Sequence, residues 1–185
     1  MAALGLSRPH MPYKPLIMSI LISPMIVPLI ITAAGMFFFY ARINLVYTFT
    51  GVILAHVALA TPFVVITVTA TLVGFDMNMV KAAQSLGAKP LRTFFKVIMP
   101  LILPGIISGA LFAFITSFDE VVIVMFMASI DQLTIPKQMW AGIRQEISPV
   151  ILCMATCLVI LSIVLLTTVE LLRRRSERLR GIKAR

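Results

Sequence analysis

The side chains of this sequence best suited to bind a solute are two adjacent carboxylates inside an apolar stretch. Asp119 and Glu120 follow Ser117 and have apolar runs on both sides. Each acid costs about 2.5–3.5 kcal/mol near the centre of a bilayer, so the pair needs a reason to be there. Either a membrane helix ends at Phe118 and the acids cap its outer end, or Ser117, Asp119 and Glu120 form a patch on a pathway for cations. Two carboxylates exclude an anion carrier.

A lone histidine and a pair of cysteines are the other reactive groups in the apolar runs. His56 has no acidic neighbour in sequence, which favours a packing histidine over a functional one, although an intramembrane histidine is a candidate for function by default. Cys153 and Cys157 lie one helical turn apart and are predicted to be small packing residues. A metal site would need further ligands, so neither a metal nor a cofactor is expected.

Residues 79–100, MVKAAQSLGAKPLRTFFKVIMP, form a basic and strongly patterned segment in this apolar chain. Asp76 predicts the start of a short helix and Gly87 its end, since glycine readily takes the left-handed conformation there. Pro90 predicts the start of a second short helix, and Pro100 predicts its end. The pair is either a loop lying on the membrane or a rigid knob for a cytoplasmic protein partner.

The helical period predicts which side chains of this segment share a face. In the first helix Met79, Ala83 and Leu86 share one face. The side chains of the second helix predicted to lie against apolar matter are Leu91, Phe94, Phe95 and Ile98, with Arg92 and Lys96 on its polar side.

The elements that must position these groups are predicted to be membrane-spanning helices. Of the 185 residues, 60% are hydrophobic and 12% are charged, and the mean hydropathy is +1.04. About 20 apolar residues suffice to cross the bilayer, and backbone hydrogen bonding in lipid then requires helices. We therefore predict one transmembrane domain over residues 1–185, with spans at 16–40, 45–73, 101–130 and 150–169, a cytoplasmic loop at 76–100 and a basic tail at 170–185.

The basic residues predict how these spans are oriented. All but three of the 16 Lys and Arg lie before the first span, between the second and third spans, or after the fourth. Only Arg42, Lys137 and Arg144 lie on the other side. The positive-inside rule then places both termini and residues 76–100 in the cytoplasm. The net charge of +9 therefore reflects membrane flanks, and no nucleic-acid partner is expected.

Small residues and prolines predict where the spans approach each other or bend. Gly105 and Gly109 form a GxxxG pair, which predicts close packing against another helix without identifying that helix. Pro24 and Pro28, one turn apart, interrupt the first span. The interruption is either a simple kink or a bend in a helix that lines a pathway.

The basic segment resembles the EAA loop of bacterial ABC importer permeases, whose pattern is E-A-A-x3-G-x9-I-x-L-P. The matching residues here are Ala82, Ala83, Gly87, Val97, Met99 and Pro100. Further motifs, GALFAFITSFDEVVIVMF, LTIPKQMW and EISP, are similar to the polyamine (spermidine/putrescine) branch of these permeases. The resemblance covers about residues 16–172. It implies an all-α, MetI-like membrane fold with about four spans and a cytoplasmic two-helix coupling loop.

This resemblance implies a permease subunit in the bacterial inner membrane that forms part of the pathway for polyamines or similar organic cations. ATP hydrolysis would take place on a separate ABC ATPase, because the chain has no GxxxxGK[ST] phosphate-binding loop and is not expected to be an enzyme. The other implied partners are a second permease subunit, identical or different, a periplasmic substrate-binding protein and lipid. The residues implied to couple to the ATPase are Lys81, Ala82, Ala83, Gly87, Ala88 and Pro100.

Two features depart from the family pattern. Lys81 stands where the family has glutamate, which reverses the charge on the coupling face. Related permeases usually have further spans before the proline-containing first span, so the chain looks truncated at its N-terminus. The alternative to a transporting subunit is accordingly a truncated, non-transporting membrane fragment or scaffold of such a permease.

Overall fold

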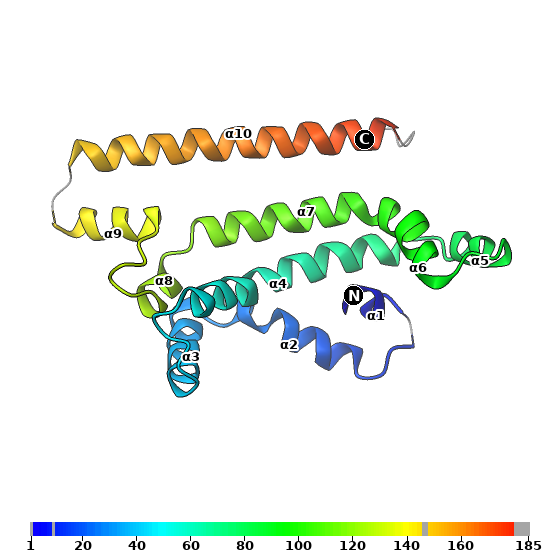
Figure 1. Ribbon diagram of the computed structural model, residues 1–185, viewed down its shortest axis with the longest axis horizontal. Helices are drawn as coiled ribbons and strands as arrows, with labels where there is room; N and C mark the ends of the chain where they lie inside the picture. The colour runs from blue at the N-terminus through cyan, green and yellow to red at the C-terminus, as the bar shows by residue number, and fades with distance from the viewer. Residues whose placement is uncertain (1, 9, 146–147, 180–185) are drawn as a thin grey trace.

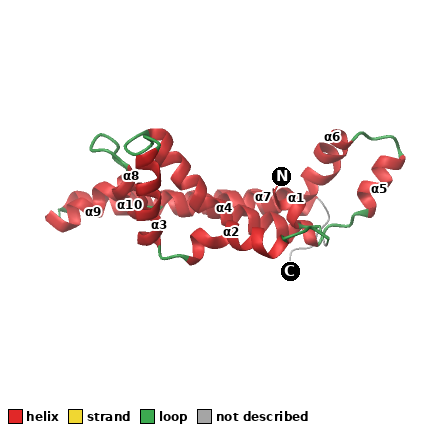
Figure 2. Ribbon diagram, turned by 90° about the horizontal axis from the view of Figure 1, so that it is seen from below, coloured by secondary structure: helices red, strands yellow, loops and turns green. Residues whose placement is uncertain are grey.

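The computed structural model describes residues 2–8, 10–145 and 148–179, and these residues form helices joined by turns, with no strand among them (Figure 1, Figure 2). The predicted all-α membrane fold is confirmed. Residues 146 and 147 of the EISP motif, and residues 180–185 of the basic tail, lie outside the described residues. The helices are α1 (Ala2–Leu6), α2 (Lys14–Ile26), α3 (Leu29–Arg42), α4 (Phe49–Val73), α5 (Asn78–Ser85), α6 (Pro90–Thr93), the π-helix η1 (Phe94–Ile98), α7 (Met99–Phe118), α8 (Val122–Met127), α9 (Ile135–Gln145) and α10 (Pro149–Leu179).

Three helical stretches among the described residues are long and apolar enough to cross a membrane: Phe49–Val73, Pro90–Phe118 and Pro149–Leu171. The helices α2 and α3 reach that length only together, and they are bent by 106° at the break between them. The predicted first span, 16–40, is thus two helices with a sharp turn. Pro28 is the residue that precedes α3, and it cannot donate a backbone hydrogen bond to continue α2.

The third span differs most from its prediction of 101–130. The helix begins at Pro90 and continues through η1 into α7, so Pro100 does not end it. In η1 the Met99 N–H donates to the Phe94 carbonyl, one residue further back than in an α-helix. This wider turn carries the helix past Pro100, whose missing N–H falls in the first turn of α7. At its other end the helix stops at Phe118 rather than at residue 130.

The two helices that pack most extensively are α4 and α7, which run side by side (Figure 1). Gly105 and Gly109 of α7 face α4 at Thr67 and Thr71. A Cβ atom added at Gly109 would lie 3.1 Å from the Val64 Cα, and one at Gly105 would lie 3.2 Å from the Thr67 carbonyl oxygen. The hydroxyl groups of Thr67 and Thr71 are hydrogen-bonded to carbonyls of their own helix, at 2.8 and 2.9 Å. The GxxxG pair therefore packs against α4 of the same chain.

Different helices lie at the two ends of the long α4–α7 pair. At one end α3, α4 and α8 meet around a cluster of buried side chains: Ala33, Ala55, Leu59, Ile123 and Met127. At the other end α1 packs on α4 and α7, and α5 and α6 project beyond them (Figure 1). The described start of the chain and the described end of α10 lie toward this second end (Figure 1). The structure thus has α5, α6 and both described chain ends on one side, and α3, α8 and α9 on the other.

Candidate coupling surface and solute pathway

The helix α5 is fixed at both ends by its own residues. The Asp76 carboxylate accepts a hydrogen bond from the Asn78 N–H at 2.9 Å, as the sequence predicts for a helix start. At the other end the Gly87 N–H donates to the Gln84 carbonyl at 2.9 Å, and the Ala88 N–H donates to the Ala83 carbonyl at 3.0 Å. These two bonds form a Schellman motif. Gly87 has φ of +78°, a conformation that costs other residues free energy.

The described chain covers only part of the predicted apolar face of α5. Val80 and Ala83 are partly buried, whereas Met79 and Leu86 are exposed. Leu86 is 89% exposed at the end of the helix. The period fixes which residues share a face but not which neighbour is present to cover them, and the described chain leaves Met79 and Leu86 uncovered.

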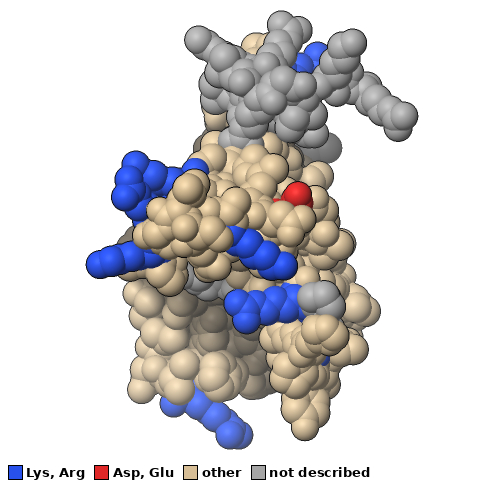
Figure 3. Space-filling model, turned by 90° about the vertical axis from the view of Figure 1, so that its right-hand side faces the viewer, with Lys and Arg blue, Asp and Glu red and all other residues tan. Residues whose placement is uncertain are grey.

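Most of the residues predicted to couple to an ATPase lie in α5 or directly after it. Lys81 and Ala82 are exposed, Ala83 and Ala88 are half-buried, and Gly87 is exposed with nothing within 4 Å of an added Cβ. Pro100 lies apart from them in the long helix, where it is exposed. Lys and Arg predominate among the charged side chains visible on this end of the molecule (Figure 3).

The described chain covers only part of the apolar side of the second helix, α6 with η1. Thr93 is buried, and Phe94 and Ile98 are half-buried, but Leu91 and Phe95 are exposed. The described chain therefore covers Phe94 and Ile98 but not Leu91 and Phe95, and that these two lie against apolar matter stays a prediction. Both lie on the same exposed side of the projecting pair, where the described chain offers no helix to cover them.

The adjacent acids have different environments. Asp119 is the first residue after α7 and is exposed. Glu120 is buried, at 6% exposure, and its carboxylate accepts a hydrogen bond of 2.7 Å from the Ile123 N–H at the start of α8. Burial raises the pKa of Glu120, the backbone hydrogen bonds from Ile123 and Val122 oppose that rise, and the charge of Asp119 adds to it. Glu120 therefore acts as a cap for α8, and only Asp119 is open to a solute.

Ser117 is paired with the intramembrane histidine. Its Oγ lies 2.9 Å from Nδ1 of His56, and the two groups share a hydrogen bond between α7 and α4. His56 is thus a satisfied histidine within the packed pair, as its sequence context favoured. The two residues are 61 positions apart, so local sequence could not identify the partner.

A cavity of about 380 Å³ lies beside Asp119, between the end of α7, α9 and α10. Its walls are mostly apolar, with Asp119 and the Ser162 hydroxyl as polar groups and Trp140 as an aromatic wall. The Arg144 guanidinium already covers the Trp140 ring, 5.4 Å from its centroid. A cation that entered this cavity would therefore depend on Asp119 for its counter-charge.

Lys137 has a role that sequence reasoning missed. Its ammonium group donates hydrogen bonds to the carbonyls of Ala128 and Ser129, at 3.3 and 3.1 Å, just after the end of α8. A cation is favourable at a helix C-terminus. Glu120 thus holds the start of α8 and Lys137 its end. Lys137 belongs to α9, well beyond the apolar run of α8, so local sequence did not identify its role.

The described chain thus has helices long and apolar enough to span a membrane, a capped and exposed helix pair at one end, and a mostly apolar cavity beside Asp119 at the other. The sequence profile of the family described as "Binding-protein-dependent transport system inner membrane component" matches residues 1–178, and the chain belongs to this family. It is thus a membrane component of a transport system rather than an enzyme.

Several characterised permeases are similar to the chain. The spermidine/putrescine transport system permease protein PotC of Haemophilus influenzae is 29% identical over 177 residues, which cover 96% of this chain and 69% of that protein. PotC of Escherichia coli is 29% identical over 174 residues, covering 94% and 66%. The putrescine transport system permease protein PotI of Escherichia coli is 38% identical over 103 residues, covering 56% and 37%. The chain spans about two thirds of the length of the PotC proteins.

Proposed function

We propose that the chain is a permease subunit of an ATP-driven importer for polyamines or similar organic cations, with ATP hydrolysed on a separate ATPase subunit. The names of its relatives support the solute class. Family membership supports a periplasmic substrate-binding protein and a second permease subunit as partners. The observation that carries the proposal is the capped, exposed α5–α6 pair at the opposite end of the spans from Asp119. With α5 and α6 facing the ATPase, both termini would lie in the cytoplasm.

The packing supports coupling between the two ends. The pair α5–α6 connects directly to α4 on one side and to α7 on the other. These two spans pack closely through Gly105 and Gly109, so a displacement of α5 and α6 would move them as a unit. His56 and Ser117 join the same two spans near the end that carries Asp119.

The cavity beside Asp119 supports a cationic solute. One exposed carboxylate can hold an ammonium group, and the apolar walls can cover methylene groups. We assign Glu120 and Ser117 to structure rather than to solute contact, because each is bonded within the chain.

The coupling role is tested by Gly87→Asp in a strain that lacks its own polyamine uptake and expresses the chain with its ATPase and binding protein. We expect uptake of labelled putrescine and spermidine to be abolished, with membrane insertion unchanged. The matched control is Gly74→Asp, since Gly74 is an exposed glycine at the same end whose φ of −82° is not left-handed. Unchanged uptake in Gly87→Asp would contradict the coupling role.

The solute role is tested by Asp119→Asn in the same strain. Hydrogen bonds to charged groups contribute about 1.5–3 kcal/mol, so uptake at low solute concentration should fall about 10- to 100-fold. Asp131→Asn is the control, because Asp131 is an exposed acid in the α8–α9 turn at the same end. Normal uptake in Asp119→Asn would mean that Asp119 only ends its helix.

A further inference from the structure

Several apolar side chains are exposed on the projecting segment formed by α5, α6 and η1, and three of them are the most exposed. Leu86, Leu91 and Phe95 are 89%, 72% and 60% exposed. We call these three residues the apolar tip. Removing them from water would be favourable, since burying a side chain such as Leu or Phe stabilises by about 1.5–3 kcal/mol.

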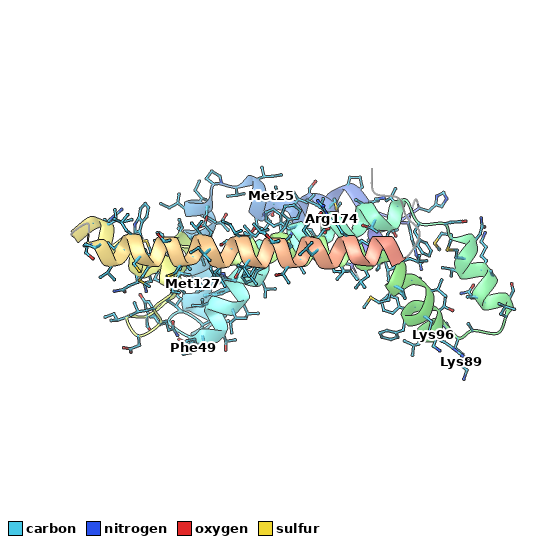
Figure 4. The ribbon with its side chains drawn as sticks, turned by 90° about the horizontal axis from the view of Figure 1, so that it is seen from above. Met25, Phe49, Lys89, Lys96, Met127 and Arg174 are labelled. Atoms are coloured by element: carbon cyan, nitrogen blue, oxygen red, sulfur yellow. The ribbon has the colours of Figure 1, made fainter. Side chains whose placement is uncertain are left out.

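Four cations lie on the same projecting segment as the apolar tip: Lys81, Lys89, Arg92 and Lys96. All four are exposed, and none has an ion-pair partner within the part of the chain that the structure describes. Lys89 and Lys96 both lie at the outer end of the α6 region, away from the long helices (Figure 4). The nearby acid, Asp76, is engaged in capping α5. We call the four residues the basic ring.

The position of α5 favours a soluble partner over the membrane surface. Figure 1 shows α5 projecting beyond the ends of α4 and α10 along the direction of the spans. Leu86, at the end of α5, is the most exposed member of the apolar tip. A loop lying on lipid would instead turn its apolar side chains back toward the spans.

We propose that the ATPase subunit receives the apolar tip in an apolar groove whose rim is acidic, with a carboxylate opposite Lys81. This inference rests on the proposed function and adds the charge of the partner surface. Complementary charge at an interface rim sets partner choice and the association rate. With an acidic groove facing position 81, the glutamate of the family pattern would be repelled there, whereas Lys81 is attracted.

The test is binding of the ATPase from the same transport system to the full chain in nanodiscs, at about 0.1 M and about 1 M salt. Lys81→Glu should weaken binding about tenfold at the lower salt, with a smaller difference at 1 M, where the Debye length falls from about 10 Å to about 3 Å. Arg42→Glu is the matched control, because Arg42 is an exposed base at the far end of the structure.

Two results of this binding measurement would overturn the inference. Equal or tighter binding by Lys81→Glu would overturn the acidic groove while leaving the proposed function intact. Absence of binding by the unaltered chain would overturn the proposed function and, with it, this inference. A charge reversal in the ATPase groove, Asp or Glu to Lys, should restore binding to Lys81→Glu.

A second measurement addresses lipid as the partner of the tip. An environment-sensitive dye is attached to Leu86→Cys in a chain that also carries Cys153→Ser and Cys157→Ser. The inference expects the same water-exposed emission in nanodiscs of phosphatidylcholine alone and of phosphatidylcholine with phosphatidylglycerol. A blue shift that increases with phosphatidylglycerol would show that the tip and the basic ring lie on the anionic membrane, and would overturn the inference.

Discussion

The close packing of α7 on α4 predicts that a single methyl group at Gly109 destabilises the protein. In Gly109→Ala the new Cβ would lie 3.1 Å from the Val64 Cα and closer still to the Thr67 hydroxyl. The Val64 atom belongs to the backbone, so a rotamer change cannot relieve the contact. Overpacking of this kind costs about 1–3 kcal/mol.

The expected loss of stability in Gly109→Ala is measured against the same substitution at Gly35, where an added Cβ meets no atom. Gly35 in α3 is exposed, and nothing lies within 4 Å of an added Cβ. In both variants alanine gains about 0.5–1 kcal/mol of helix propensity. That gain cancels in the comparison, so Gly109→Ala should be less stable than Gly35→Ala by about 1–3 kcal/mol.

Thermal unfolding of the two purified variants in the same detergent measures this difference. At about 2–4 °C per kcal/mol for a chain of this size, the midpoints should differ by roughly 2–12 °C. Adding Thr67→Ala to Gly109→Ala should restore part of the loss, because it removes the nearest atom and leaves the Val64 contact. Equal midpoints for Gly109→Ala and Gly35→Ala would refute the claim that the glycines set the spacing of α4 and α7.

Four further predictions concern the roles of single side chains. Glu120→Ala should lower the free energy of unfolding by about 0.5–2 kcal/mol through loss of the α8 cap. Folding raises the pKa of Glu120, so the free energy of unfolding should fall as the pH rises from the pKa of the unfolded state to that of the folded state. Melting measured over this pH range should show the fall in the unaltered protein and not in Glu120→Gln. Ser117→Ala should cost about 1–3 kcal/mol by leaving His56 unpaired, and the double variant with His56→Phe should be more stable than Ser117→Ala alone; equal melting would contradict the pairing. Gly87→Asn should unfold at a higher temperature than Gly87→Val, since asparagine tolerates the left-handed conformation better; the reverse order would exclude φ as the reason for glycine.

Local signals in the sequence predicted the parts of the fold that depend on few neighbours. The capping carboxylate of Asp76 and the left-handed Gly87 both act within one turn of α5, and both are where the sequence predicts them. The GxxxG pair likewise predicted a close helix contact, although its partner, α4, needed the structure. The helix content follows from the apolar runs, because the backbone of a segment in lipid must satisfy its own hydrogen bonds.

The parts that sequence could not predict depend on distant or competing groups. The run after Glu120 is apolar enough to extend a span, and only the hydrogen bond from Ile123 to Glu120 identifies a separate short helix. Pro100 predicts a helix end because it lacks a backbone N–H, but the wide turn of η1 lets the helix pass it. The pairing of Ser117 with His56 depends on how α4 and α7 align, which no local pattern encodes.

The π-helix η1 also determines the rotational phase of the third span. One extra residue in a turn rotates everything that follows by about 100° relative to a regular helix. The side of α6 that carries Leu91 and the side of α7 that carries Gly105 are therefore offset by a fixed angle that this turn sets. Deleting a single residue between them would leave both motifs intact yet turn the glycines away from α4. The number of residues in η1 therefore determines which side of α7 faces α4.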